Sequence, residues 1–271
     1  MKKKYIFLVI NLLIFTFGNK FAFSEQDYIL VPHNAIYEIK LKNTKQGSNI
    51  YSINGTMQTE WLEECESWVF NQHTVLDVGT TFGENSRSEY VFSTLEDKEN
   101  TNYKFLARTF SEGELEEKIQ GIATKNSDGN KVVFHSPEVL GYELPNDTLF
   151  PVAHYKAIME MIKYKQHAKS FNVFSGDSID SLENVNVIIF QLSKEHNVTL
   201  KHPDIFKNKS LIGIRLAYFD YFSREEYPSL EITVNIASNG IATMLEIDYP
   251  GFSIVGKLRE ISLLKRKNCS D

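Results

Sequence analysis

Cysteine is scarce in this chain, which has only Cys65 and Cys269 among its 271 residues. No His or Cys lies at zinc-finger spacing near either thiol, so the sequence contains no pattern of a structural metal site. Low-complexity tracts and Gly/Pro-rich linkers are also absent. Residues 25–271 are long enough to form a single large domain, which we favour, or two small ones; either would bury an adequate core, and we expect no bound metal.

The common catalytic motifs are missing as well. There is no G-x-S-x-G motif or P-loop, and the seven histidines include no H-x-x-x-H pair. Glu96-Asp97 and Asp177 are the carboxylates that a glycan hydrolase could use as a pair, but each lies in a stretch typical of a turn. We expect no catalytic residue, no cofactor and no enzymatic activity.

The N-terminus has the pattern of a signal peptide. Lysines at positions 2–4 precede an apolar run over residues 5–17, which is too short to cross a hydrocarbon core of about 30 Å. Ala22 and Ser24 suit a cleavage site, so we expect residues 1–24 to be removed after about Ser24 and the protein to reside in the periplasm. The alternative is an uncleaved membrane anchor.

Positive charge is in short supply after this cleavage. The segment carries four lysines and no acidic residue, so its removal changes the formal net charge from −6 to −10. Such a surface repels nucleic acid and anionic membrane surfaces. We therefore exclude nucleic acid as a partner.

An exported protein folds in an oxidising compartment, where two thiols of one domain pair. The sequence therefore predicts a disulfide between Cys65 and Cys269, which would close a loop of about 200 residues and stabilise the fold by at most about 5 kcal/mol. Pairing between two molecules through the C-terminal tail remains an alternative.

Apolar and polar residues alternate with period two over most of the chain, which predicts β-strands. The clearest strand covers Ile36–Leu41, and Asp128-Gly129 indicates a hairpin. Asn54-Gly55 suggests either a hairpin turn or a bulge within one long strand. Near the C-terminus, a type I′ turn at Asn239-Gly240 and a reversal at Pro250-Gly251 predict a three-stranded meander.

One segment has helical spacing instead. Asp147 or Thr148 is suited to cap it and Pro151 to enter its first turn. An apolar face follows at i, i+3, i+4 and i+7: Tyr155, Ile158, Met159 and Ile162. We expect this helix to pack against the sheet, rather than to bind a membrane surface or a partner.

Several stretches together carry a resemblance to a known family. They are "PHNAIYEIKL", "CESWVFNQ", "FSTLEDKENTNYKF", "LPNDTLFPVAHYKAIME", "FSGD" and "NGIATMLEIDYPGFSIVGKLREI". In their order and spacing the chain resembles the EipB-like family of periplasmic cell-envelope integrity proteins of alphaproteobacteria, over nearly the whole mature length. The resemblance implies a monomeric, many-stranded antiparallel β-spiral, an incompletely closed barrel, with the Cys65–Cys269 disulfide.

The resemblance also implies a role without catalysis. We expect a mainly β protein, with one amphipathic α-helix packed against the spiral, that supports envelope integrity by binding an envelope component or a periplasmic protein. The alternative is a carrier of a lipid, peptide or other apolar ligand in the half-open barrel. Trp61, Trp68 and His33 are candidate ligand or packing residues.

Overall fold

The computed structural model describes residues 29–192, 203–207, 209–223 and 225–269. The expected signal peptide, residues 1–24, lies outside them. Within the described residues, fourteen strands and two helices are formed. No helix among these residues is both long and apolar enough to cross a membrane.

The strands follow one another in the chain as a long antiparallel meander, interrupted by helices α1 and α2. The first eight strands are β1 His33–Thr44, β2 Ile50–Glu63, β3 Ser67–Thr80, β4 Asn85–Asp97, β5 Asn102–Ser111, β6 Glu114–Asn126, β7 Gly129–Ser136 and β8 Leu140–Glu143. After α1 Pro151–Lys163 come β9 Ala168–Phe174, β10 Leu182–Gln191, α2 Pro203–Phe206, β11 Leu211–Asp220, β12 Leu230–Ala237, β13 Ala242–Asp248 and β14 Phe252–Leu263.

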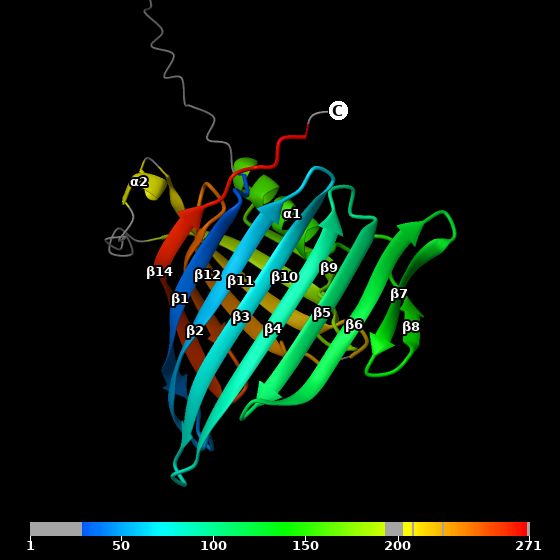
Figure 1. The fold of residues 1–271 in the computed structure, drawn as a ribbon. Coiled ribbons are helices and arrows are strands. Elements are labelled where there is room, and N and C mark those ends of the chain that lie inside the picture. The colour runs from blue at the N-terminus through cyan, green and yellow to red at the C-terminus, as the bar shows by residue number, and fades with distance from the viewer. Residues whose placement is uncertain (1–28, 193–202, 208, 224, 270–271) are drawn as a thin grey trace, which may run out of the picture.

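All fourteen strands belong to one sheet, in the order β8-β7-β6-β5-β4-β3-β2-β1-β14-β13-β12-β11-β10-β9. The first and last strands of the chain, β1 and β14, pair in the middle of this order. The sheet curves so that β2–β6 form one wall and β9–β12 lie behind them, with α1 at the upper end (Figure 1). The edge strands β8 and β9 do not pair. The expected incompletely closed β-spiral is therefore confirmed.

The edge of β9 is already occupied by the chain that leads into α1. Leu149 donates its N–H to the carbonyl oxygen of Asn172 at 2.8 Å and accepts the N–H of Phe174 at 3.0 Å. Hydrogen-bonding groups at this end of β9 are thus unavailable to β8, and the edge is protected. Because β8 has only four residues, its own free edge is short.

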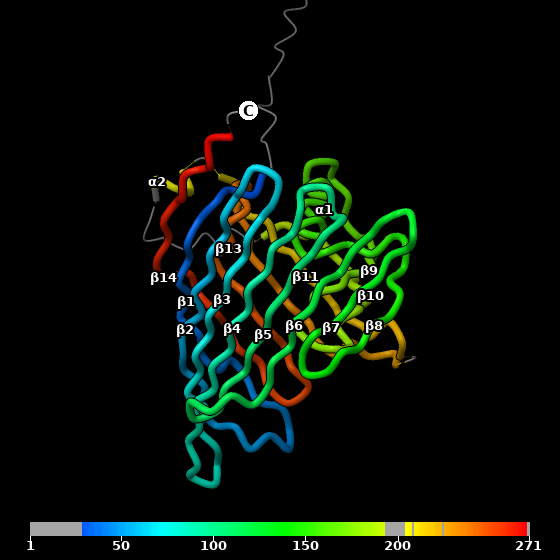
Figure 2. Tube along the Cα trace, turned by 45° about the vertical axis from the view of Figure 1, so that its right-hand side comes forward, coloured from blue at the N-terminus to red at the C-terminus, as the bar shows by residue number. Residues whose placement is uncertain are grey.

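Aromatic side chains fill the seam between the two ends of the sheet, which lie close together in the tube view (Figure 2). The ring of Phe174 on β9 lies 6.3 Å from that of Phe134 on β7 and 6.4 Å from that of Tyr142 on β8. The hydroxyl group of Tyr142 donates to the carbonyl oxygen of Ile179, just beyond β9. Side-chain packing rather than strand pairing therefore fills the gap between β8 and β9.

The interior is filled by the inward faces of the strands. Every second residue at the start of β1 is buried, as period-two alternation requires. The buried residues form three large clusters, and α1 contributes Ile158, Met159 and Ile162 to one of them, against β9–β12. The predicted apolar face of the helix is confirmed.

The cap of α1 differs from the sequence expectation. Neither Asp147 nor Thr148 caps it, because the helix begins at Pro151 and its N-cap, Phe150, has no capping side chain. Asp147 instead accepts hydrogen bonds from the side chain of Asn172. The carboxyl group that binds the first helical N–H groups comes from Glu96, at the end of β4.

Two turn predictions also change. Asn54-Gly55 does lie within one long strand, β2, as the second alternative had it. It forms neither a hairpin turn nor a bulge there, because Gly55 pairs in register with Ile39 on one side and Leu76 on the other. A Cβ at Gly55 would lie 2.1 Å from the carbonyl oxygen of Val75, so the glycine permits close strand packing. Asp128-Gly129 does form the predicted hairpin.

The turn between β12 and β13 is not type I′. Only Gly240 has a positive φ there, at 81°, whereas Asn239 does not. The N–H of Gly240 donates to the carbonyl oxygen of Ala237, and a register shift follows at Asn235/Ile236. One glycine in the left-handed region and a bulge replace the two positive φ angles of the predicted turn.

Candidate functional site

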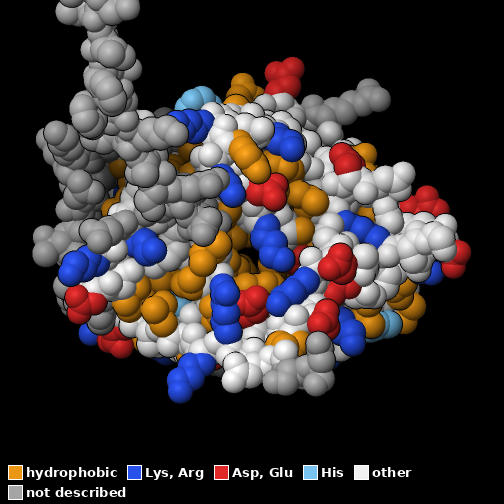
Figure 3. Space-filling model, turned by 90° about the horizontal axis from the view of Figure 1, so that it is seen from above, with side chains coloured by type: hydrophobic (Ala, Val, Ile, Leu, Met, Phe, Trp, Pro, Cys, Tyr) orange, Lys and Arg blue, Asp and Glu red, His pale blue; other side chains and the backbone are white. Residues whose placement is uncertain are grey.

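A cleft with a volume of about 310 Å³ opens at the upper end of the spiral, beside α1. Seen from above, charged side chains surround a hollow in which hydrophobic side chains are visible (Figure 3). Five separate parts of the chain form the walls. They are residues 29–30 before β1, the adjoining ends of β2 and β3, the β4–β5 loop, α1, and the C-terminal tail, residues 264–269.

The floor of the cleft is apolar. It consists of Leu30, Trp68, Tyr155 and Met159. Trp68 and Met159 are only 4% and 3% exposed, so each presents a small part of its surface to the cleft. Leu30, Trp68 and Val152 form a small core cluster beneath it, with Trp61 and Tyr155 packed against the cluster.

Tyr155 attaches α1 to the β12–β13 turn, which also binds the chain before β1. Its hydroxyl group donates to the carbonyl oxygen of Gly240 at 2.6 Å. The chain before β1 crosses the same turn, because the N–H groups of Ile29 and Val31 donate to Ser238 and Asn239. A Cβ at Gly240 would lie 2.9 Å from both Leu30 Cα and the Tyr155 oxygen, so only glycine permits this contact.

The rim of the cleft is charged. Its residues are Glu63, Lys98, Lys156, Glu160, Lys163 and Arg266. Glu63 forms ion pairs with two basic side chains: its Oε1 lies 3.0 Å from Lys98 Nζ, and its Oε2 lies 2.9 Å from Arg266 Nε. Four basic and two acidic side chains leave a local positive charge, although the chain as a whole is acidic.

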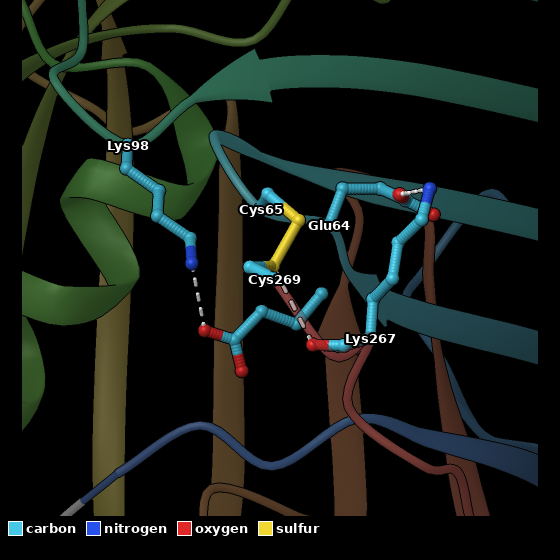
Figure 4. Close-up of a disulfide and its surroundings, with 6 residues drawn as sticks. Glu64, Cys65, Lys98, Lys267 and Cys269 are labelled. Carbon is cyan, nitrogen blue, oxygen red and sulfur yellow. Dashed lines mark hydrogen bonds and ion pairs between the residues drawn. A yellow bond between two sulfur atoms is a disulfide. The ribbon is translucent and has the colours of Figure 1, made fainter. Parts of the chain in front are cut away.

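The expected disulfide between Cys65 and Cys269 is present in the structure, with the two Cα atoms 5.6 Å apart. It joins the β2–β3 turn to the C-terminal tail (Figure 4). Beside it, Lys267 Nζ lies 2.5 Å from Glu64 Oε2. Farther back along the tail, the N–H of Leu264 donates to the carbonyl oxygen of Pro32. The bond and these contacts hold Arg266 at the rim of the cleft.

The three candidate ligand or packing residues have different positions. Trp68 lines the cleft, whereas Trp61 lies beneath it, with its ring 4.5 Å from Phe70 and 5.7 Å from Tyr155. His33 is 2% exposed, and its Nδ1 lies 2.7 Å from the carbonyl oxygen of Val31. Burial lowers the pKa of His33, which keeps the ring neutral. Neither Trp61 nor His33 is among the described residues that line the cleft.

The carboxylates considered for hydrolysis have structural partners. Glu96 is 1% exposed and accepts the N–H groups of Val152 and Ala153 at 2.7 and 2.8 Å. Burial raises the pKa of Glu96 to about 7, and these two hydrogen bonds partly oppose the increase. Asp97 accepts hydrogen bonds from Thr101 and Asn102 in the next turn.

Asp177 likewise has a local partner, since Ser175 Oγ lies 2.7 Å from its Oδ1. Asp97 and Asp177 thus take part in turn hydrogen bonds, as the sequence pattern indicated. Glu96 instead lies in β4 and binds the first turn of α1, which the sequence pattern did not indicate. Among the described residues, no group of three or more His, Cys, Asp or Glu side chains has an arrangement that could hold a metal ion.

Sequence reasoning missed the basic rim. Lys98, Lys156 and Arg266 come from a loop, a helix and the tail, and their spacing in the chain gives no sign that they converge. The available signal was the tail cysteine. A disulfide at Cys269 brings Arg266, three residues earlier, next to the segment around Cys65.

Known proteins match the chain over most of its length. The family model described as EipB-like matches residues 24–265. The cell envelope integrity protein EipB of Brucella abortus (strain 2308) is 26% identical over 238 residues, which cover 86% of this chain and 84% of the relative.

A solved structure has the same fold. It is the crystal structure of a beta-barrel-like protein of a domain of unknown function from Brucella abortus. It aligns with a TM-score of 0.80 and 23% sequence identity, covering 88% of this chain and 100% of that chain. Since the family model spans nearly the whole described chain, this protein belongs to the EipB-like family.

Proposed function

We propose that this protein supports the integrity of the cell envelope from the periplasm, as a monomer and without catalysis, by binding an envelope component or a protein partner. The observation that carries the proposal is family membership, because the matched relative is named a cell envelope integrity protein. The N-terminal pattern of residues 1–24 supports export, since it has the length and flanking residues of a signal peptide.

The cleft beside α1 supports a binding role. It joins an apolar floor to a charged rim, which suits a ligand with both an apolar and a charged part. The carboxylates that a hydrolase would need, Glu96 and Asp97, are engaged by backbone N–H groups and turn side chains. Their engagement favours binding over hydrolysis.

A carrier of a lipid or another apolar ligand is the second candidate. The interior of the spiral contains three clusters of tightly buried side chains and α1, which leaves the cleft as the better place for such a ligand. The carrier hypothesis therefore moves from the half-open barrel to its upper end.

Deletion of the gene in the bacterium that encodes it tests the main proposal. We expect the deletion strain to become sensitive to detergent and to EDTA, because both agents stress a weakened envelope. The full-length gene should restore resistance, and a version without residues 2–24 should not. An unchanged detergent and EDTA tolerance would overturn the proposal.

The intact mass of the protein isolated from the periplasm, measured under native conditions, separates the two candidates. A lipid-sized addition to the chain mass favours the carrier. A bare chain favours the protein-partner role, in which case crosslinking in the periplasm should yield a defined second protein.

A further inference from the structure

We propose that the cleft beside α1 binds a single-chain anionic amphiphile, with the chain on the apolar floor and the anionic headgroup at the basic rim. This inference rests on the proposed binding function and names its ligand class. The ligand is one acyl chain that carries a carboxylate or phosphate group and is taken up as a single molecule.

The headgroup assignment follows from charge. Lys163 has an interaction of its own, and apart from it the rim has three basic side chains, Lys98, Lys156 and Arg266, against the acidic Glu63 and Glu160. Glu63 contacts both Lys98 and Arg266, so one carboxylate is shared by two cations. An anionic group at this rim would supply the missing negative charge, whereas a cationic headgroup would add to the excess.

Lys156 is the basic side chain that we assign to the headgroup. It projects from the second turn of α1, four residues before Glu160, and lines the cleft together with Tyr155 and Met159. Its charge also acts on the buried Glu96, whose pKa it lowers against the effect of burial. A lysine between an apolar floor and the opening is suited to bind the first polar group of an amphiphile.

The floor indicates an acyl chain. Leu30, Trp68 and Met159 offer aliphatic and aromatic carbon, and each is less than a tenth exposed. The volume of about 310 Å³ lies at the small end of the range for ligand sites, about 300–1,000 Å³, so one chain fits better than a two-chain phospholipid.

Headgroup binding at the rim should depend on the disulfide. Arg266 is three residues from Cys269, and the tail that carries it is tied to the β2–β3 turn by the bond. Without the bond, the tail is held at the rim by the ion pairs Arg266–Glu63 and Lys267–Glu64, in which both basic side chains are more than half exposed, so each pair stabilises the tail only weakly. Loss of the disulfide should therefore weaken headgroup binding in the same direction as loss of the Arg266 charge.

A dansylated undecanoic acid is a suitable probe for the mature protein. The chain has only two tryptophans, Trp61 and Trp68, and both lie at or beneath the floor. Energy transfer from tryptophan to the dansyl group therefore reports binding at this cleft. We expect saturable transfer that laurate and dodecyl phosphate reverse.

The variant Lys156→Glu should weaken probe binding by about tenfold or more, because it replaces an attractive charge by a repulsive one at close range. Lys131→Glu is the matched control, since it makes the same charge change at an exposed position of β7. It should leave binding unchanged. Circular dichroism and the thermal midpoint verify that both variants fold.

Competitors separate the possible ligand classes. Dodecanol and dodecyltrimethylammonium should displace the probe much less well than laurate. Equal displacement of the probe by laurate, dodecyl phosphate, dodecanol and dodecyltrimethylammonium would overturn the proposal. Equal probe binding by Lys156→Glu and the wild type would also overturn it. Displacement by inorganic phosphate as strong as that by dodecyl phosphate would show a simple anion site and would also overturn it.

Failure here and failure of the envelope role are distinguishable. If Lys156→Glu binds the probe like the wild type while the deletion strain remains sensitive to detergent, the ligand assignment is wrong and the envelope role stands. If the probe binds as expected but the deletion strain is unaffected, the ligand assignment stands and the envelope role is wrong.

Discussion

Replacing Glu96 tests whether a strand residue determines how α1 is held. Glu96 is buried at the end of β4, and each of its carboxyl oxygens accepts one N–H group from the first turn of the helix. The variant Glu96→Ala leaves both N–H groups without an acceptor. Glu96→Gln keeps one carbonyl oxygen and loses about one of the two hydrogen bonds.

The expected magnitudes follow from these contacts. A buried donor left without a partner costs about 1–3 kcal/mol, so Glu96→Ala should lower the free energy of unfolding by about 2–6 kcal/mol. In a chain of this size, 1 kcal/mol corresponds to about 2–4 °C in Tm. Glu96→Gln should lie between Glu96→Ala and the wild type. The exposed Glu99, three residues later, supplies the control Glu99→Ala, which should cost less than about 0.5 kcal/mol.

The pH dependence separates the proton of Glu96 from its hydrogen bonds. Burial raises its pKa from 4.5 to about 7 in the folded protein, so the folded state holds this proton longer than the unfolded state. Its stabilising effect is complete below pH 4.5 and is lost as the pH rises through 7. The stability difference between wild type and Glu96→Gln should therefore shrink over that window.

Urea unfolding, followed by circular dichroism across this pH range, measures both effects. If Glu96→Ala and Glu99→Ala have the same free energy of unfolding, Glu96 does not hold the helix. A wild-type advantage over Glu96→Gln that grows as the pH rises would refute the raised pKa.

Two further predictions concern the disulfide and a buried histidine. Cys65→Ser and Cys269→Ser should each lower the free energy of unfolding by the same amount, at most about 5 kcal/mol for this 204-residue separation. The double variant should be no less stable than either single variant, because both changes remove the same bond. Additive losses in thermal denaturation would contradict the pairing. His154 is 6% exposed, packs on Phe171, and its Nε2 has no hydrogen-bond partner among the described protein atoms. Burial lowers its pKa from 6.5 to about 4, so its stabilising effect is present above pH 6.5 and is lost as the pH falls through 4. His154→Leu should remove this acid-side loss, and parallel stability curves for the two proteins would count against it.

Much of the architecture is encoded locally and was therefore open to prediction. The sequence left open which face of β1 is buried, because Ile36 is apolar too, and only the structure shows Ala35, Tyr37 and Ile39 inside. The strand itself and the apolar face of α1, with Ile158, Met159 and Ile162, were predicted. These patterns depend only on the repeat of a strand or a helix. The disulfide followed from export and from a cysteine count of two, without any knowledge of the fold.

Local signals failed where a distant contact decided the outcome. Asn54-Gly55 has the composition of a turn, yet it lies inside β2 because the neighbouring β3 approaches it closely at Val75. Asp147 and Thr148 are suitable caps, but the helix begins after them, where Glu96 reaches its first turn. In both cases a tertiary contact outweighs the local preference.

Period-two alternation, helical spacing and the count of two cysteines predict most of the strands, the long helix and the covalent link between the β2–β3 turn and the tail, because each depends on local periodicity or on residue count. The segment that occupies the edge of β9 and the basic rim above Trp68 could be found only in the folded chain. These features bring together chain segments that are far apart in the sequence. Their cause lies in sheet curvature and in the path of the chain around α1, which no short stretch encodes.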